Sequence, residues 1–248
     1  MDRRGHFRCL RVSRCAAGTV AFCACVAAVD CALAQTDSAS PAVQTSTFNE
    51  NRIFGVMPNY QTVDDPSPNI VPLTARQKWT LAGKETVDPF NVFSAGFGAA
   101  FSQAGNQTPK YGDGAAAFAK RFGAAYADFA TQNFFSTGVL ACALHQDPRY
   151  FRKGPESGVL QRIGYSVSRI VIVRKDSGTN TFNSSGLFGM MLGIVASNAY
   201  YPAASVSGSV MVGRLQTSLL GGVIGNLTSE FWPDFQRGFS RKFHLKKP

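Results

Sequence analysis

Apolar and small residues recur at helical spacing through most of the chain beyond Thr74. Between residues 114 and 144, Phe118, Phe122 and Phe129 follow one another at intervals of four and seven residues, which places them on one face of a helix. Alanine runs in the same segment favour helix over strand. The spacing therefore predicts a mainly helical chain.

Capping residues and prolines divide this pattern into separate helices. Thr74 and Gln77 have the spacing of a capping box, and Asp88 followed by Pro89 has the form of a cap with proline in the first turn. Further helices are expected over residues 157–170, 184–200 and 207–230, and Pro233 is expected to end the last of them. The predicted fold is all-α, a single compact bundle of about six to seven Gly/Ala-rich helices after an extended N-terminal leader.

The segment beginning at Ser157 leaves two questions to the structure. Its apolar stripe contains Leu160, Ile163 and Val167, and Arg162 and Arg169 lie on the opposite side. We expect these arginines at the surface. Beyond the stripe, the β-branched run of residues 170–173 and the turn-forming residues 176–178 leave a local hairpin as an alternative to helix.

Residues 1–34 resemble a bacterial export signal. Five arginines precede an apolar run of about 15 residues, and Ala32-Leu33-Ala34 has the small-x-small form of a cleavage site. The expected domains are a cleavable signal peptide (1–34), an extended or disordered leader (35–71) and a helical domain (72–248). Cleavage removes five of the six cysteines and leaves Cys142, which lies in an apolar run and is expected to be buried.

The net charge of +10 is concentrated in the second half of the chain. Residues 145–248 contain 13 basic and five acidic residues. An exported protein is not expected to bind nucleic acid, so an anionic membrane surface or an envelope protein is the expected partner. The candidate contacts are Arg162, Arg169, Arg174, Lys175, Trp232, Arg241 and Lys242.

The densest cluster of chemically useful side chains is His145 to Phe151. His145, Asp147, Arg149 and Tyr150 could supply a base, a carboxylate, an anion clamp and a hydroxyl, so they are the candidate ligand-binding residues. The alternative is a helix terminus, with His145 in the last turn and Asp147 capping the next. No hydrolase elbow, phosphate loop or metal-ligand spacing is present, so we expect no catalytic residue, metal or cofactor.

Glycines at helical spacing suggest close helix packing. Gly189 and Gly193 are four residues apart in an uncharged stretch, a device that membrane helices use. A membrane-inserted helical oligomer packed through glycine faces therefore remains a further alternative, although the apolar part of this stretch is short for a bilayer of about 30 Å.

Four sequence blocks resemble the signature segments of an uncharacterised bacterial exported helical family. They are RIFGVMPNY (52–60), HQDPRYF (145–151), NAYYP (198–202) and EFWPD (230–234). The resemblance implies one domain and an envelope location, periplasmic or peripheral on the outer membrane, and it implies no reaction. The expected function is that of a non-enzymatic exported cell-envelope protein. The competing hypothesis is a small-ligand binder or hydrolase-like enzyme centred on His145, Asp147 and Arg149.

Overall fold

The computed structural model describes residues 52–53, 55–63 and 71–242, with side chains up to Gly238. All of these belong to one compact unit, residues 39–248. The predicted signal peptide and most of the predicted leader lie outside the described residues.

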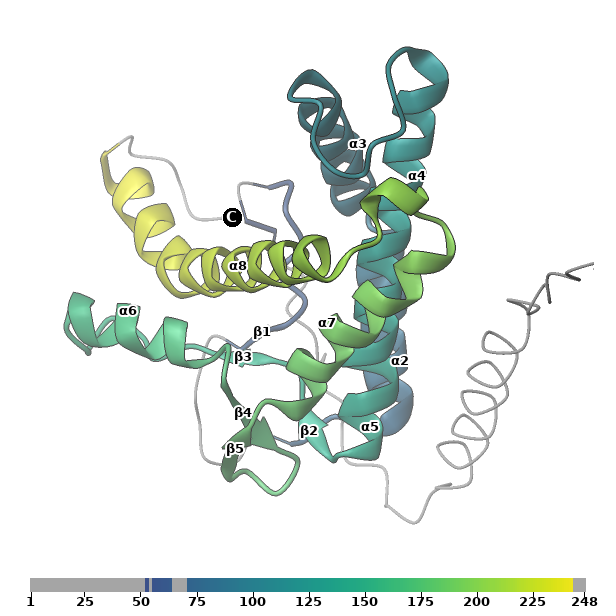
Figure 1. The fold of residues 1–248 in the computed structure, drawn as a ribbon. Helices are drawn as coiled ribbons and strands as arrows, with labels where there is room; N and C mark the ends of the chain where they lie inside the picture. Colours follow the sequence, from purple (N-terminus) through teal and green to yellow (C-terminus); the bar gives the residue numbers. More distant parts are fainter. Residues whose placement is uncertain (1–51, 54, 64–70, 243–248) are drawn as a thin grey trace, which may run out of the picture. The chain divides into compact units, whose positions relative to one another are not determined.

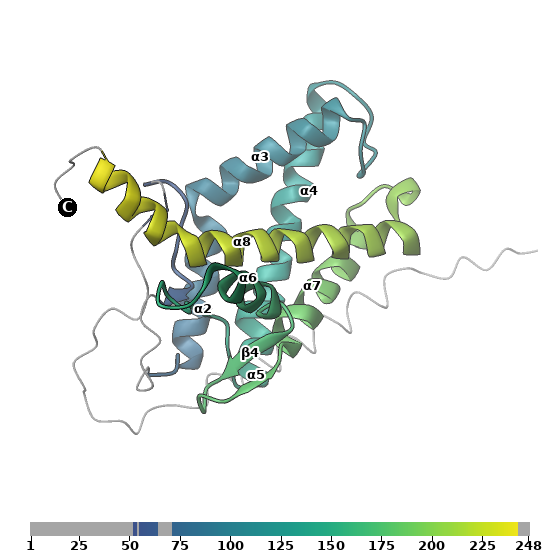
Figure 2. The ribbon, with the colours of Figure 1, turned by 90° about the vertical axis from the view of Figure 1, so that its left-hand side faces the viewer.

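Most of the described chain is helical, which confirms the sequence prediction at this coarse level (Figure 1). The α-helices are α2 (Ala75–Val87), α3 (Pro89–Ala104), α4 (Ala115–Asn133), α5 (Ala141–Ala143), α6 (Val159–Ser168), α7 (Ser184–Ala196) and α8 (Gly208–Lys242). A π-helical segment, η1 (Phe134–Leu140), joins α4 to α5, and two 3₁₀ turns, η2 (Ser197–Ala199) and η3 (Ala203–Ser205), separate α7 from α8. The loop after α3 brings the chain back onto α4 (Figure 2).

Two small sheets of short strands accompany the helices. Strands β2 (Gln146–Asp147), β4 (Ile172–Lys175) and β5 (Asn180–Phe182) form an antiparallel sheet, and β1 (Thr62–Val63) pairs in parallel with β3 (Tyr150–Phe151). The β4–β5 hairpin is the alternative that the β-branched run had left open. The β1–β3 pair joins residues far apart in sequence, so no local pattern could reveal it.

Most predicted helix starts are correct to within a residue or two. Thr74 and Gln77 make both hydrogen bonds of a capping box at α2, and the carboxylate of Asp88 accepts from the backbone N–H of Phe90 at α3. Two helices begin differently from the ranges expected at residues 157 and 184. Gly158 precedes α6, and Asn183 caps α7. Asn183 Oδ1 accepts the Gly186 N–H at 2.9 Å, so its side chain takes the capping role.

Close packing through glycine holds α7 against α4 and η1. A methyl group on Gly189 would lie 2.5 Å from Cα of Ser136, and one on Gly193 would lie 2.9 Å from Cα of Gln132. Neither glycine could accept a side chain without backbone movement. The Gly189–Gly193 pair therefore packs within the chain, and this face is not free for a second copy.

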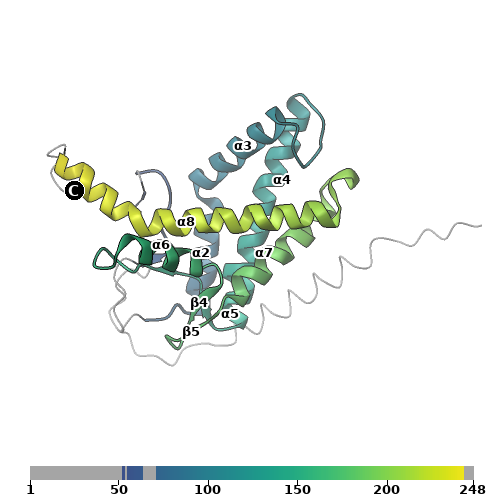
Figure 3. The same ribbon diagram turned by 60° about the vertical axis from the view of Figure 1, so that its left-hand side comes forward.

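Helix α8 continues through Pro233, so the prediction that this proline ends the helix is wrong. The helix changes direction toward its C-terminal end (Figure 3). A proline inside a helix removes one backbone donor and displaces the preceding turn. Two arginines bind the helix just before this proline: Arg152 donates to the backbone carbonyl of Glu230 at 2.9 Å, and Arg162 donates to the same carbonyl at 2.7 Å.

Part of the predicted leader packs onto the helical unit. Ile53 is buried, and Arg52 forms an ion pair with Asp88 at 2.6 Å, where Tyr60 also donates to the carboxylate. With β1 added, residues 52–53 and 55–63 pack onto the helical part of the chain.

The interior is unusually polar. Within the described part of the chain, 17 polar or charged residues are buried against 13 hydrophobic ones, and six of those 13 are alanines. Large apolar side chains are instead exposed on α3, α6, α7 and α8. Because isolated buried charges are costly, the fold depends on how these polar groups are paired.

Candidate functional site

The four ligand-binding candidates do not form one site. His145 lies at the surface, where its side chain is 69% exposed, and its Nδ1 is 3.9 Å from Asp176. Its backbone has a φ of +51°, so it forms the turn after α5. Asp176 is already bound by the buried Lys78 at 2.7 Å. His145 therefore lies where the chain reverses direction, beside the ion pair of Lys78 and Asp176.

Asp147 and Arg149 are buried and paired with each other. Arg149 donates from Nε at 2.9 Å and from Nη2 at 2.6 Å to the two carboxylate oxygens, and its backbone N–H also reaches Asp147. A further bond from Arg149 holds the Val71 carbonyl. This two-pronged geometry satisfies both charges, so neither group is available as a base or as a free anion clamp.

Tyr150 belongs to a different cluster, around Glu230. Glu230 is fully buried and accepts from the Tyr150 hydroxyl at 2.8 Å, from Arg162 Nε at 2.8 Å and from the backbone N–H groups of Lys153 and Gly154. Burial opposes the charge on Glu230, but the bond from Arg162 and these other donors outweigh it and lower the pKa. Burial, together with the bond to Glu230, raises the pKa of Tyr150.

Arg162 contradicts its predicted place at the surface. It is buried, forms ion pairs with Glu230 and Asp234, and stacks over the ring of Phe231 with a centroid distance of 4.3 Å. The basic residue predicted to contact lipid is therefore the cation of an internal cluster. The reason is tertiary: α8 presents two carboxylates to this side of α6.

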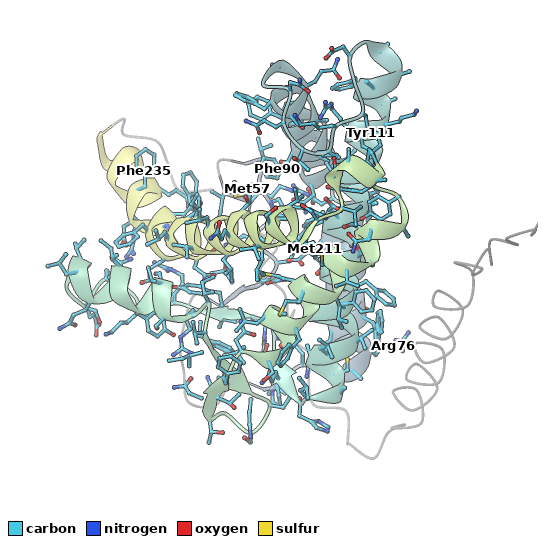
Figure 4. The ribbon with its side chains drawn as sticks, in the orientation of Figure 1. Met57, Arg76, Phe90, Tyr111, Met211 and Phe235 are labelled. Carbon is cyan, nitrogen blue, oxygen red and sulfur yellow. The ribbon has the colours of Figure 1, made fainter. Side chains whose placement is uncertain are left out.

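The other predicted contact residues are found in different settings. Arg169 and Arg174 are half-buried beside aromatic rings, and Lys175 is exposed. Trp232 is half-buried and stacks on Phe235, which Figure 4 labels on the last turns of α8. Arg241 and Lys242 lie at the end of α8, and their side chains are outside those described.

A second polar cluster, which is half-buried, was missed by the sequence analysis. Asp128 accepts from the hydroxyls of Tyr200 and Tyr201, both at 2.6 Å, and pairs with Arg214 at 2.9 Å. Burial and the carboxylate raise the pKa values of both tyrosines. The available signal was Asp128 as the one acidic residue of the alanine- and phenylalanine-rich α4, because a carboxylate on the packed side of such a helix needs a partner.

The four quoted sequence blocks share a structural use. Each contributes to a polar cluster: Arg52 and Tyr60 to that of Asp88, the segment 145–151 to those of Asp147 and Glu230, Tyr200 and Tyr201 to that of Asp128, and Glu230 with Asp234 to that of Arg162. Their dense polar and aromatic composition is explained by internal pairing.

A cavity of about 580 Å³ lies between these clusters. Its walls come from α4, η1, the first turn of α7, the middle of α8 and strand β4. Glu85 of α2 also lines it, and Gln61 donates to that carboxylate at 2.6 Å. Burial raises the pKa of Glu85 to about 8, so this group is protonated in most molecules at neutral pH. Polar and apolar side chains alternate around the cavity, which could hold a small ligand.

Helix α6 is turned opposite to the usual amphipathic orientation. Arg162 and Ser166 are buried, whereas Val159, Ile163 and Leu160 are exposed, Leu160 to 84%. The neighbouring hairpin exposes the apolar side chains of Ile172 and Phe182 as well. The apolar stripe was correctly found in the sequence, but it faces outward.

Comparable stripes occur on other helices. Phe93, Phe97 and Phe101 are exposed at intervals of four residues on α3, and α7 exposes Phe188, Met191, Leu192 and Val195. Exposed apolar patches larger than a few hundred Å² are rare on monomeric soluble proteins and indicate contact with a partner or a membrane. The surface is therefore a stronger functional feature than any single polar group.

The described residues show neither a metal site nor a membrane-spanning helix. No group of three histidine, cysteine or acidic side chains gathers as a metal site would within the described ranges. In the described helices no stretch combines the length and the apolar character needed to cross a bilayer. Comparison with protein-family models, curated proteins and solved structures gives no match, and the resemblance to an exported family stays a prediction.

Proposed function

We propose that the protein is a non-enzymatic, exported cell-envelope protein that lies on a membrane surface through outward-facing apolar helix faces. The orientation of α6 is the observation that carries this proposal. An amphipathic helix with its apolar side exposed and its polar side fixed internally has the arrangement of an interfacial helix. The export-signal pattern of residues 1–34 supports the envelope location.

The internal polar clusters explain why this face cannot turn inward. Rotating α6 to bury Leu160 would move Arg162 away from Glu230 and leave this buried carboxylate without its cation. Removing one partner of a buried ion pair costs about 3–5 kcal/mol, whereas burying a leucine gains about 1.5–3 kcal/mol. The exposed stripe is thus the less costly arrangement in water, and lipid can cover it.

The basic half of the chain contributes less surface charge than its composition suggests. Arg149, Arg162 and Arg214 are paired internally, and Arg152 is bound to the Glu230 carbonyl. Lys153 and Lys175 remain exposed. We therefore expect apolar contact to supply most of the membrane affinity, with a smaller, salt-sensitive contribution from anionic headgroups.

Vesicle flotation tests the proposal. The chain from Gln35 onward is mixed with vesicles of phosphatidylcholine, or of phosphatidylcholine with phosphatidylglycerol, and the floating fraction gives the partition coefficient. Leu160→Glu should weaken binding to both compositions by about tenfold or more, because it removes about 1.5–3 kcal/mol of apolar transfer.

Gln161→Glu is the matched control, because it adds the same charge at an exposed neighbouring position. It should bind neutral vesicles as the wild type does. Failure of the wild type to float with either composition would count against the proposal, as would equal floating of the two variants. Dimerisation that Leu160→Glu abolishes, without vesicle binding, would show that a second copy covers this face.

A further inference from the structure

The charges that line the 580 Å³ cavity do not balance. Five acidic or basic side chains contribute to its wall: Glu85, Asp128, Arg149, Arg169 and Arg174. Asp128 is neutralised by Arg214, and Arg149 by Asp147. With Glu85 held mostly in its protonated form, two guanidinium groups remain without an opposing carboxylate within 4.0 Å in the described part of the chain.

Arg169 is the first of these two. It follows the last turn of α6, its guanidinium carbon lies 4.5 Å from the ring centroid of Tyr165, and Nη1 donates to Asn180 Oδ1 at 2.9 Å. Its Nε is buried and has no hydrogen-bond partner among the described residues. Leaving a buried donor in this state is costly, so an additional acceptor at this nitrogen would be favourable.

Arg174 is the second of these two and lies on strand β4. It pairs with Asn180 in the β4–β5 ladder, and its guanidinium carbon is 4.9 Å from the ring centroid of Phe151. Asp147 is its cross-strand neighbour in β2, but both oxygens of that carboxylate are taken by Arg149. Asn180 therefore connects the two arginines: its backbone pairs with one and its side chain holds the other.

The arrangement selects for an oxyanion. Arginine has donors only and binds phosphate or carboxylate oxygens through its planar fork. Aromatic rings hold the two guanidinium groups in place, which reduces the ordering needed on binding. Ile170, Ile172 and Met190 line the same cavity, so the space beside the two cations can also accept an apolar group.

We propose that Arg169 and Arg174 bind a phosphate group at the wall of this cavity, either free phosphate or the headgroup of a phospholipid. The inference goes beyond the proposed function, because the site is formed by a different side of α6 from the exposed stripe. Arg162 and Ser166 face the interior, and the ring of Tyr165 lies against Arg169. The two proposals can therefore fail separately.

The test measures two probes on the same proteins. Binding of inorganic phosphate is measured by equilibrium dialysis, and binding of the headgroup is measured as the added affinity for vesicles when phosphatidylglycerol is mixed into phosphatidylcholine. Arg169→Gln and Arg174→Gln should each reduce whichever of these two quantities the wild type shows, phosphate binding or the added affinity for phosphatidylglycerol, by about tenfold or more. Arg76→Gln, at an exposed position on α2 that Figure 4 labels, removes the same charge and should change neither.

Each outcome decides the inference. Saturable phosphate binding that depends on both arginines identifies free phosphate as a ligand. A phosphatidylglycerol preference that depends on them, without phosphate binding, identifies the lipid headgroup. If the wild type shows neither, or if Arg76→Gln loses as much as the two variants, the inference is wrong.

Circular dichroism checks the fold of the variants, and Arg169→Lys keeps the charge while removing Nε. It should recover only part of the binding. Loss of binding to pure phosphatidylcholine in Leu160→Glu belongs to the membrane proposal and leaves this inference unaffected.

Discussion

Substitutions at two positions of α6 test whether its apolar face points outward or packs inward, as in an ordinary amphipathic helix. In an ordinary helix, Arg162→Ala would cost little and loss of Leu160 would cost much. The structure predicts the reverse. Arg162 contacts Glu230 Oε1 at 2.8 Å, the Glu230 carbonyl at 2.7 Å and Asp234 at 2.5 Å, so its removal leaves a buried carboxylate without its cation. The expected loss in the free energy of unfolding is about 3–5 kcal/mol.

The magnitude for Leu160 follows from its exposure. The residue is 84% exposed, so only about a sixth of the 1.5–3 kcal/mol that a fully buried leucine contributes is present, or roughly 0.3–0.5 kcal/mol. Leu160→Ser should therefore stay within the range of ordinary surface substitutions, about 0.5 kcal/mol. The two variants should differ by several kcal/mol although they are two residues apart.

Urea unfolding followed by far-ultraviolet circular dichroism measures both changes. Leu81→Ala is the reference for a true core loss, because Leu81 is fully buried and its truncation should cost about 2–5 kcal/mol. The reasoning is refuted if Leu160→Ser destabilises as much as Leu81→Ala while Arg162→Ala has no effect.

Two further predictions concern packing and protonation. Gly189→Ala should destabilise by about 1–3 kcal/mol, because the new methyl group would lie 2.5 Å from Cα of Ser136; Gly98→Ala, where the space is open, should stabilise by up to about 1 kcal/mol, and urea unfolding that gives both the same sign would contradict this. Glu85 has a folded-state pKa of about 8, raised from an ordinary 4.5. Between pH 4.5 and about 8 the folded state therefore keeps a proton that the unfolded state loses. The free energy of unfolding should fall as pH rises through this range, by up to about 1.4 kcal/mol per pH unit. Glu85→Gln should be about as stable as the wild type near pH 4.5 and more stable at pH 8–9; an equal difference at both pH values would show that Glu85 does not titrate in this way.

Local chemistry accounts for what could be predicted from the sequence. The capping box at Thr74 and the Asp88-Pro89 start depend only on neighbouring residues, and both are found. The spacing of Phe118, Phe122 and Phe129 found the long helical segment, but it gave no sign that residues 134–140 are π-helical. Within this segment Ser136 lies close to Gly189 of α7, a contact between elements that no local pattern shows.

The direction in which helices face could not be predicted in the same way. Periodicity identifies an apolar side of α6 but does not say what the other side meets. Arg162 is buried because Glu230 and Asp234, about 70 residues later, are brought to it by α8. Pro233 was expected to stop that helix, but α8 continues through it, and Arg152 and Arg162 both bind the Glu230 carbonyl just before it. These pairings exist only in three dimensions.

The most direct test of membrane contact is the environment of position 160 itself. A single cysteine at Leu160, in the chain from Gln35 onward carrying Cys142→Ala, is labelled with an environment-sensitive fluorophore and mixed with vesicles containing brominated phosphatidylcholine. We expect the emission of a label at position 160 to shift to the blue and to be quenched by bromine. A label on a cysteine at Gln161 should show much weaker effects. A label at position 160 that stays in water while the protein is bound to vesicles would contradict it.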